Sequence, residues 1–217
     1  MKVLITRLLG EDSLLQKWCN DHNITLVESP FISTESVQTK DLPSTDWIFF
    51  TSPKGAKHYL DQHSIDGRKI GVIGEGTTRA LSKYNLTPDF AGNSTNTENV
   101  GEAFKELIKD QTVLFPIGNK SLKRIQGKLD PRQIKEVLIY TTISLNKAIP
   151  EDVDIIICSS PSNGEGLKKS GLAKSLPLIA FGKSTAAYLK KELNQNKVVT
   201  LTAFNEEAIV QALETLQ

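Results

Sequence analysis

Short apolar runs rich in β-branched and aromatic residues recur along the 217-residue chain, and each is followed by small or polar residues and then by apolar positions at helical spacing. This alternation is typical of βα units built on a parallel sheet, so we predict an α/β protein with helices between its strands, one of them over residues 121–129. The predicted strands are Val3–Thr6, Thr25–Ser29, Trp47–Thr51, Ile70–Ile73, Val113–Phe115, Val137–Thr141, Ile155–Cys158, Leu178–Phe181 and Val198–Thr202, with a weaker one at Asp89–Ala91.

Two sequence blocks recur in the chain, which indicates an internal duplication. WIFFTSPKGAKHYL aligns with IIICSSPSNGEGLK and places Ser52 on Ser160, at a separation of 160 − 52 = 108 residues. IGVIGEGTTRAL aligns with LIAFGKSTAAYL and places Gly74 on Gly182, at the same separation. VLITR at the start of the chain similarly resembles VLFPIG, but the blocks follow one another in a different order in the two halves.

The domain boundaries allow two partitions. A simple one divides the chain near residue 110. We favour the other, which pairs residues 1–33 with 147–217 and makes 45–143 an inserted domain. The polar, proline-containing segments STESVQTKDLPST and ISLNKAIPEDV then supply the interdomain linkers, at 34–44 and 144–146. Each domain would hold five parallel strands in a doubly wound order, with its functional crevice outside the carboxyl ends of the strands.

The charge is nearly balanced, with 26 basic and 25 acidic residues and a formal net charge of +1. No bulk field therefore favours nucleic acid or an anionic membrane, and any anion site must be local. The chain opens directly on a strand pattern, and none of its apolar runs approaches the roughly 20 residues that span a bilayer. We therefore expect a cytoplasmic protein that binds neither nucleic acid nor membrane.

The cysteines and histidines show no metal-binding spacing. Cys19 and Cys158 lie in apolar stretches without a CxxC pattern, so we expect buried free thiols in a reducing compartment. The histidines His22, His58 and His63 have no pairing that suggests zinc, and we expect them to face solvent. No metal site is predicted.

The residues at the carboxyl ends of the predicted strands are mostly small, hydroxylic or amide. Helix N-termini begin at such strand ends, and their free N–H groups favour anions. An acidic small molecule is therefore the expected ligand, although the same residue types also serve as ordinary helix caps. The candidate binding residues are Thr6, Arg7, Ser52, Gly74, Thr77, Gly118, Asn119, Ser160 and Ser162 within the segment Ser159–Asn163, Gly182 and Thr185.

Other catalytic signatures are absent from the sequence. It contains no GxGxxG, GxxxxGK[ST] or GxSxG motif, so a nucleotide-dependent enzyme or a serine hydrolase has little support. Tyr140 is the one phenol at the end of a predicted strand, in the run EVLIY, and is a candidate proton donor. The alternative for Tyr140 is a tyrosine of the core or its rim.

In its order of motifs the chain resembles the uroporphyrinogen-III synthase family. The resemblance covers nearly the whole length and rests on VLITR, FFTSPKGA, IGVIGEGTTRAL, LFPIGN, the strand ending in Tyr140-Thr141, CSSPSNGEGL and IAFGKSTAAYL. It implies two flavodoxin-like domains joined by a two-stranded linker. It also implies an enzyme of haem biosynthesis that cyclises the linear tetrapyrrole hydroxymethylbilane, with inversion of ring D and loss of water. The resemblance implies no cofactor, and we expect a monomer.

The resemblance also assigns roles to residues. Tyr140 matches the family tyrosine proposed to assist loss of the hydroxyl group, and the matches to residues of the family's cleft are Ser52, Thr77, Asn119, Ser160 and Thr185. Two positions depart from the family: Leu8 stands where proline is frequent, and Leu122 where arginine is common, although Lys123 and Arg124 follow closely. Because the electron-rich pyrrole itself drives loss of the hydroxyl, such an enzyme acts mainly by positioning its substrate. A bilobal binding or sensor module without turnover remains the alternative.

Overall fold

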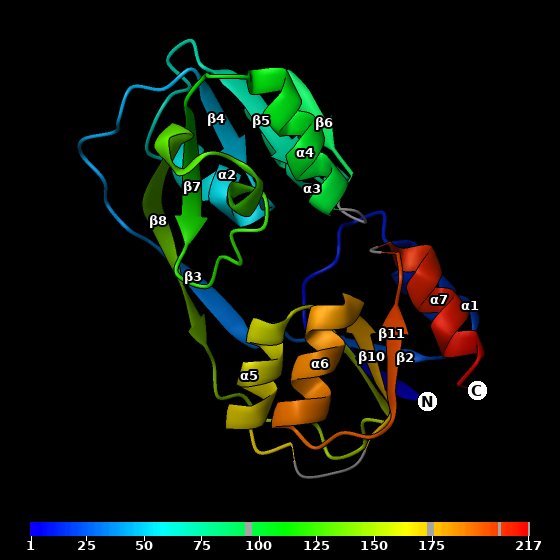
Figure 1. Ribbon diagram of the computed structural model, residues 1–217. Helices are drawn as coiled ribbons and strands as arrows, with labels where there is room; N and C mark the ends of the chain where they lie inside the picture. The colour runs from blue at the N-terminus through cyan, green and yellow to red at the C-terminus, as the bar shows by residue number, and fades with distance from the viewer. Residues whose placement is uncertain (94–96, 173–175, 204, 217) are drawn as a thin grey trace. The chain divides into compact units, whose positions relative to one another are not determined.

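The computed structural model describes residues 1–93, 97–172, 176–203 and 205–216, and shows an α/β fold with parallel sheets (Figure 1). The strands are β1 (Lys2–Ile5), β2 (Thr25–Glu28), β3 (Ile32–Ser36), β4 (Trp47–Phe50), β5 (Lys69–Ile73), β6 (Phe90–Gly92), β7 (Val113–Gly118), β8 (Ile134–Ser144), β9 (Ile155–Cys158), β10 (Leu178–Phe181) and β11 (Val198–Leu201). The helices are α1 (Leu14–Asp21), α2 (Pro53–Leu60), α3 (Glu75–Ser82), α4 (Thr97–Ile108), α5 (Pro161–Lys169), α6 (Gly182–Glu192) and α7 (Glu206–Glu214). The predicted strands are thereby confirmed.

Contacts within the chain divide it into two compact units. Unit 1 comprises Met1–Ser33 and Ile143–Gln217, and unit 2 comprises Thr34–Thr142. The chain passes from unit 1 to unit 2 within β3 and returns within β8. These two strands run antiparallel, because the N–H of Val37 donates to the carbonyl of Ile139 and the N–H of Leu145 donates to that of Phe31.

The sheet of unit 1 has the order β11-β10-β9-β1-β2, with parallel pairing throughout its described strands. Counted along the chain, this is the flavodoxin-like order 2-1-3-4-5. Side chains alternate between its two faces, so that Val3 and Ile5 pack with α1 and α7 whereas Leu4 packs on the side of α5 and α6 (Figure 1). Unit 1 therefore has a hydrophobic core on each side of its sheet.

The sheet of unit 2 has the order β3-β8-β7-β4-β5-β6. Its parallel strands β4 to β8 follow the order 3-2-1-4-5 along the chain, so the expected flavodoxin-like order is wrong for this unit. The reason is that the chain enters the unit at β4, whose sequence aligns with β9, the third strand of unit 1. The antiparallel edge strand β3 is a sixth strand that the sequence analysis did not predict.

The core of unit 2 is also divided by its sheet. Phe49 and Phe115 pack with α4 on one face, and Ile48 and Phe50 pack with α2 and α3 on the other. The helix predicted over residues 121–129 is wrong, since only a 3-10 turn forms there, at Gln126–Lys128. Lys123 has a φ of 51°, in the left-handed region, which an α-helix cannot continue through.

Gly166 on α5 packs directly against the chain where it leaves β2. A Cβ atom on Gly166 would lie 2.3 Å from the carbonyl oxygen of Phe31 and 2.6 Å from its Cβ atom. Glycine to alanine normally stabilises a helix by about 0.5–1 kcal/mol. We expect Gly166→Ala to do the opposite and to cost about 1–3 kcal/mol, because backbone must move. The melting temperature, measured by a thermal melt, should then fall by roughly 2–10 °C.

Gly76 on α3 is the matched control, because a Cβ atom there would meet only Cγ of Pro53, at an ordinary 3.5 Å. Gly76→Ala should melt at or above the temperature of the unsubstituted protein. A Gly166→Ala variant as stable as Gly76→Ala would contradict the packing of α5 against Phe31.

Candidate active site

The predicted binding residues lie at the carboxyl ends of the parallel strands in both units, where the helices begin. In unit 1, Thr6 and Arg7 follow β1, and the starts of α5 and α6 follow β9 and β10. In unit 2, the starts of α2 and α3 follow β4 and β5, whereas Gly118 ends β7. At the predicted residues, the helix N-termini are therefore those of α5 and α6 in unit 1 and of α2 and α3 in unit 2, the arrangement that favours an anion.

The helix starts of the two units have the same local geometry. Ser52 and Ser160 are extended N-caps followed by proline, and their hydroxyl oxygens accept hydrogen bonds from the N–H groups of Gly55 (3.0 Å) and Asn163 (3.2 Å). Each hydroxyl is thus a helix cap that still has its own proton to donate. At the second pair of starts, Gly74 and Gly182 have φ values of 82° and 77°, which only glycine adopts readily.

A β-bulge sets the position of Tyr140. Along β7 and β8 the register pairs Ile117 with Leu138 and then Gly118 with Tyr140, so Ile139 is an extra residue in β8. Ile139 and Tyr140 consequently both pack on the α2 side of the sheet, although neighbouring residues of a regular strand face opposite sides. The bulge therefore places the Tyr140 ring over Gly118.

The Tyr140 ring is enclosed on two sides. A Cβ atom on Gly118 would lie 2.4 Å from Cζ of the ring, so only glycine leaves room for it. On another side the ring stacks on that of His58, with centroids 5.1 Å apart and planes 13° apart. Asn119 also holds the backbone around Tyr140. Its N–H donates to the carbonyl of Tyr140, and the Asn119 Oδ1 accepts from the N–H of Thr142. A Cβ atom on Gly55 would lie 3.3 Å from Oγ of Ser52 and 4.0 Å from Cε1 of Tyr140. Ser52, Gly118, Asn119 and Tyr140 thus lie in one cluster of unit 2.

His58 belongs to this cluster and is the residue that sequence reasoning misread. It is only 8% exposed, so the expectation of a solvent-facing side chain is wrong. Its Nδ1 and Nε2 lie 2.7 Å and 2.9 Å from the hydroxyl oxygens of Ser36 and Thr34. Burial lowers the pKa of His58 below its ordinary value, and the Lys57 ammonium adds to the effect. The available signal was its spacing from Gly55 and Tyr59, which share the buried face of α2.

The corresponding edge of unit 1 is a hydrogen-bonded network. Thr6 is fully buried, its Oγ1 accepts from the N–H of Ser159 at 2.9 Å, and the two hydroxyl oxygens lie 3.1 Å apart. The amide of Asn163 donates to the hydroxyls of Ser159 and Ser160, and its Oδ1 accepts from the N–H of Phe31. Thr6 therefore joins β1 to β9 from inside the unit.

Arg7 is the cation that the fold holds at this edge. Its guanidinium lies 4.9 Å from the ring centroid of Phe181 and 3.6 Å from a carboxylate oxygen of Glu206. Glu206 also accepts hydrogen bonds from the Ser13 hydroxyl and the N–H of Leu15, at the start of α1. In unit 2 the ammonium of Lys123, one candidate replacement for the family arginine, pairs with Glu136.

The two predicted threonines on helices are buried, as Thr6 is. Thr77 is 2% exposed and Thr185 is 1% exposed, each in the first turn of its helix, whereas Ser162 on α5 is half-buried. The partly exposed groups are the caps Ser52 and Ser160, together with Arg7 and Tyr140.

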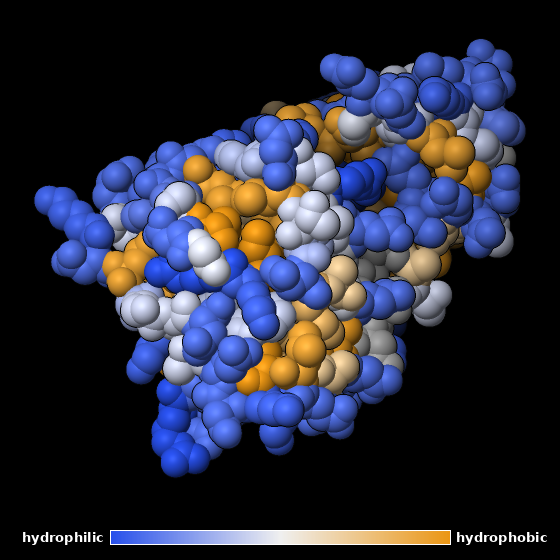
Figure 2. All heavy atoms as spheres, turned by 90° about the horizontal axis from the view of Figure 1, so that it is seen from above, coloured by the Kyte–Doolittle hydropathy of each residue, from blue (hydrophilic) through white to orange (hydrophobic). Residues whose placement is uncertain are grey.

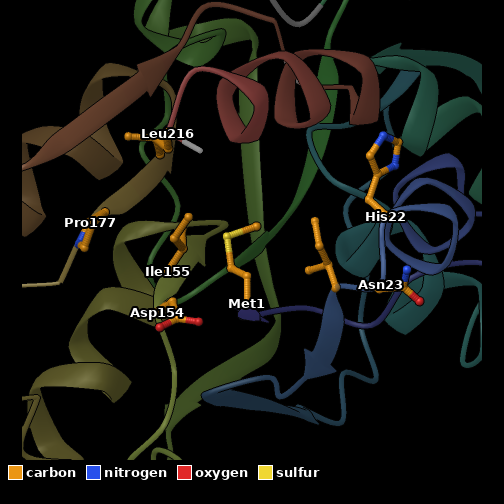
Figure 3. Close-up of a pocket in the computed structure, with 8 residues that line it drawn as sticks. Met1, His22, Asn23, Asp154, Ile155, Pro177 and Leu216 are labelled. Atoms are coloured by element: carbon orange, nitrogen blue, oxygen red, sulfur yellow. The ribbon is translucent and has the colours of Figure 1, made fainter.

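A hollow of about 520 Å³ lies at the opposite edge of the unit 1 sheet (Figure 3). Met1, Ile24, Asp154 and Pro177 line it, at or next to the amino ends of β1, β2, β9 and β10. None of the predicted site residues lines it. Ligands of open α/β sheets bind at the carboxyl ends, so this hollow is not the candidate site.

The remaining surface adds little to the site. Among the described residues, no group of three or more potential metal ligands comes together, and no helix is long and apolar enough to cross a membrane. Both cysteines are free and buried, as predicted. Burial raises the pKa of Cys19 to about 11 and that of Cys158 to about 12.

On the surface, hydrophobic residues form separate patches among hydrophilic ones in the view of Figure 2. Leu8 and Leu122, the two departures from the family, are 70% and 64% exposed.

Comparisons with known proteins agree on one family. The family model described as uroporphyrinogen-III synthase HemD matches residues 13–211. A Methanocaldococcus jannaschii protein, provisionally named uroporphyrinogen-III synthase, is 25% identical over 220 residues, covering 88% of this chain and 89% of that protein. The porphyrin biosynthesis protein HemD of Ruminiclostridium josui is also 25% identical, and the match covers 88% of this chain but 44% of that protein. The crystal structure of uroporphyrinogen-III synthetase from Helicobacter pylori matches with a TM-score of 0.70, covering 100% of this chain and 99% of that one at 13% identity, which supports the fold.

Proposed function

The chain belongs to the uroporphyrinogen-III synthase family, and from this premise we propose that it converts hydroxymethylbilane to uroporphyrinogen III, with inversion of ring D and loss of water. Members of the family serve haem biosynthesis and act on a small tetrapyrrole. The observation that carries the proposal is the family match over residues 13–211, which includes the Tyr140 cluster and the starts of α2, α3, α5 and α6.

The chemistry of the site suits this reaction. Hydroxymethylbilane carries many carboxylates, which are complementary to the helix N-termini of α2, α3, α5 and α6 and to Arg7. We assign substrate binding to these groups, with the residues Thr6, Ser52, Gly74, Thr77, Gly118, Asn119, Ser160, Ser162, Gly182 and Thr185 shaping the surface around them.

Tyr140 is assigned the proton-transfer step. Its phenol donates a hydrogen bond or proton to the hydroxyl of the substrate, which leaves as water. The electron-rich pyrrole supplies the electrons for this departure and becomes an azafulvene. Ring D then bonds to it through its substituted carbon, forming a spiro intermediate whose rearrangement inverts the ring. No cofactor, nucleic acid or membrane enters this scheme, and we propose that a monomer carries it out.

The two units are proposed to descend from one duplicated domain, with residues 1–33 and 147–217 forming one copy and 45–143 the other. The support is the shared geometry of the helix starts, at Ser52 and Ser160 and at Gly74 and Gly182. The unequal sheet orders fit a second copy in which the two sequence blocks are exchanged.

An isomer assay tests the proposed function. The protein is incubated with freshly generated hydroxymethylbilane, the products are oxidised, and the uroporphyrin isomers are separated. We expect isomer III well above the isomer I that forms spontaneously, and only isomer I with heat-denatured protein. Binding of hydroxymethylbilane without isomer III would contradict the synthase and favour the binding module.

A further inference from the structure

The His58 side chain connects three elements of unit 2, α2, β3 and β8. It projects from α2, stacks on the Tyr140 ring of β8, and has both ring nitrogens within hydrogen-bonding distance of hydroxyls on β3. All of these contacts lie within unit 2. The proton-transfer step proposed above involves only Tyr140. It does not explain why a buried histidine packs against the Tyr140 ring.

We propose that His58 is a positioning residue that holds the Tyr140 ring in the orientation in which its hydroxyl meets the substrate. This inference rests on the proposed function only in assigning the reacting proton to Tyr140. The orientation of the Tyr140 ring is a property of the protein without its substrate, and it can be measured in the substrate-free protein.

The geometry leaves the imidazole plane no freedom to turn. Its two nitrogens, on either side of Cε1, lie within hydrogen-bonding distance of the hydroxyls of Ser36 and Thr34, which are two residues apart on the same strand. A rotation about the bond to the ring would break both hydrogen bonds. Because the Tyr140 ring lies nearly parallel to this plane, a fixed imidazole also fixes the tilt of the phenol.

Gly118 completes the enclosure of the phenol. The ring atoms of Tyr140 occupy the space that a side chain at Gly118 would fill, and His58 lies against the ring as well. The strand that supplies Ser36 and Thr34 also pairs with β8, through the hydrogen bond from Val37 to Ile139. The strand that holds His58, β3, and the strand that carries Tyr140, β8, are therefore hydrogen-bonded neighbours.

The charge state of His58 fits a positioning role. The charged groups near it are Lys54, Lys57 and Asp61, all on or next to α2, and burial acts in the same direction as the two lysines. The pKa of His58 is therefore below its ordinary value, and the ring is neutral at neutral pH. A neutral imidazole donates through one nitrogen and accepts through the other, which two serine or threonine hydroxyls can satisfy.

The experiment compares His58→Phe with His63→Phe. Phenylalanine at position 58 keeps a flat ring against Tyr140 but loses both hydrogen bonds to β3. His63 is the matched control, because its Nε2 also lies beside a threonine hydroxyl, that of Thr39, and its ring contacts Tyr59 instead of Tyr140. Should His58→Phe fail to fold, the double variant Thr34→Val with Ser36→Ala removes the same hydrogen bonds and leaves the histidine in place.

The first readout needs no substrate. In protein with ¹³C-labelled tyrosine and histidine rings, the Tyr140 signals, identified by their loss in Tyr140→Phe, should shift as the pH is lowered until the His58 signals show that this ring has taken up a proton. We expect this shift to vanish in His58→Phe and to persist in His63→Phe. Tyr140 signals that do not respond while the His58 signals titrate, or whose pH response is unchanged by His58→Phe, would overturn the inference.

The second readout is a double-mutant cycle on isomer III formation. His58→Phe should lower kcat by roughly 10- to 100-fold, the scale of a misplaced catalytic group, with a much smaller change in KM. In the Tyr140→Phe background it should cause no further loss, because no hydroxyl remains to be positioned. An equal loss in both backgrounds would show a merely structural role. If the unsubstituted protein forms no isomer III, the proposed function fails, and the signals of Tyr140 decide the positioning alone.

Discussion

Tyr140→Phe is expected to lower kcat for isomer III formation by about 100-fold, the lower end of the range for general acid catalysis. The substitution removes the phenolic proton and keeps the ring that packs against Gly118 and His58. The lower end applies because the pyrrole itself expels the hydroxyl group. KM should change little, since carboxylate binding is assigned to helix N-termini and Arg7. A thermal melt should show the folded variant within a few degrees of the unsubstituted protein.

Tyr84→Phe is the matched control for this substitution. Tyr84 lies in unit 2 beyond the end of α3 and donates its hydroxyl proton to Asp61 at 2.6 Å, away from the strand ends. Its loss should leave isomer III formation unchanged. A Tyr140→Phe variant with the same activity as Tyr84→Phe would remove Tyr140 from the proton-transfer step.

The strands could be predicted from the sequence because their apolar runs are continuous. Strands such as Ile155–Cys158 are buried on both faces and flanked by turn residues, a pattern that local sequence displays. The edge strand β3 has the sequence ISTES, with four polar residues of five, and forms because β8 extends to Ser144 and offers it a partner. Such a strand is a consequence of tertiary pairing, which its own residues do not reveal.

The helix starts of the candidate site were also visible in the sequence. Ser52-Pro53 and Ser160-Pro161 carry the N-cap and N1 preferences of a helix, and the structure places caps at both. The setting of Tyr140 was not visible, because the bulge at Ile139 depends on the register between β7 and β8. His58 was misread because its polarity suggested solvent, while its partners lie on the unpredicted strand β3.

The bulge and the missing side chain at Gly118 together make the space for Tyr140, so Gly118→Ala is the second substitution with a large expected effect. A Cβ atom there would lie 2.4 Å from Cζ and 2.8 Å from the hydroxyl oxygen of Tyr140. The ring cannot simply tilt away, because it is stacked on His58. We expect the phenol to be displaced, with a loss of kcat of about 100-fold and a cost in stability of about 1–3 kcal/mol.

Two comparisons separate displacement of the phenol from general damage. Gly127→Ala is the matched control in the same unit, since a Cβ atom there meets no atom within 4 Å, and it should keep full activity. In the Tyr140→Phe background, Gly118→Ala should still lower the melting temperature, because the phenyl ring remains, but it should not lower kcat further, because the hydroxyl is already gone. Full activity in Gly118→Ala would mean that Tyr140 can act from another position, and the enclosed orientation of its ring would then have no part in catalysis.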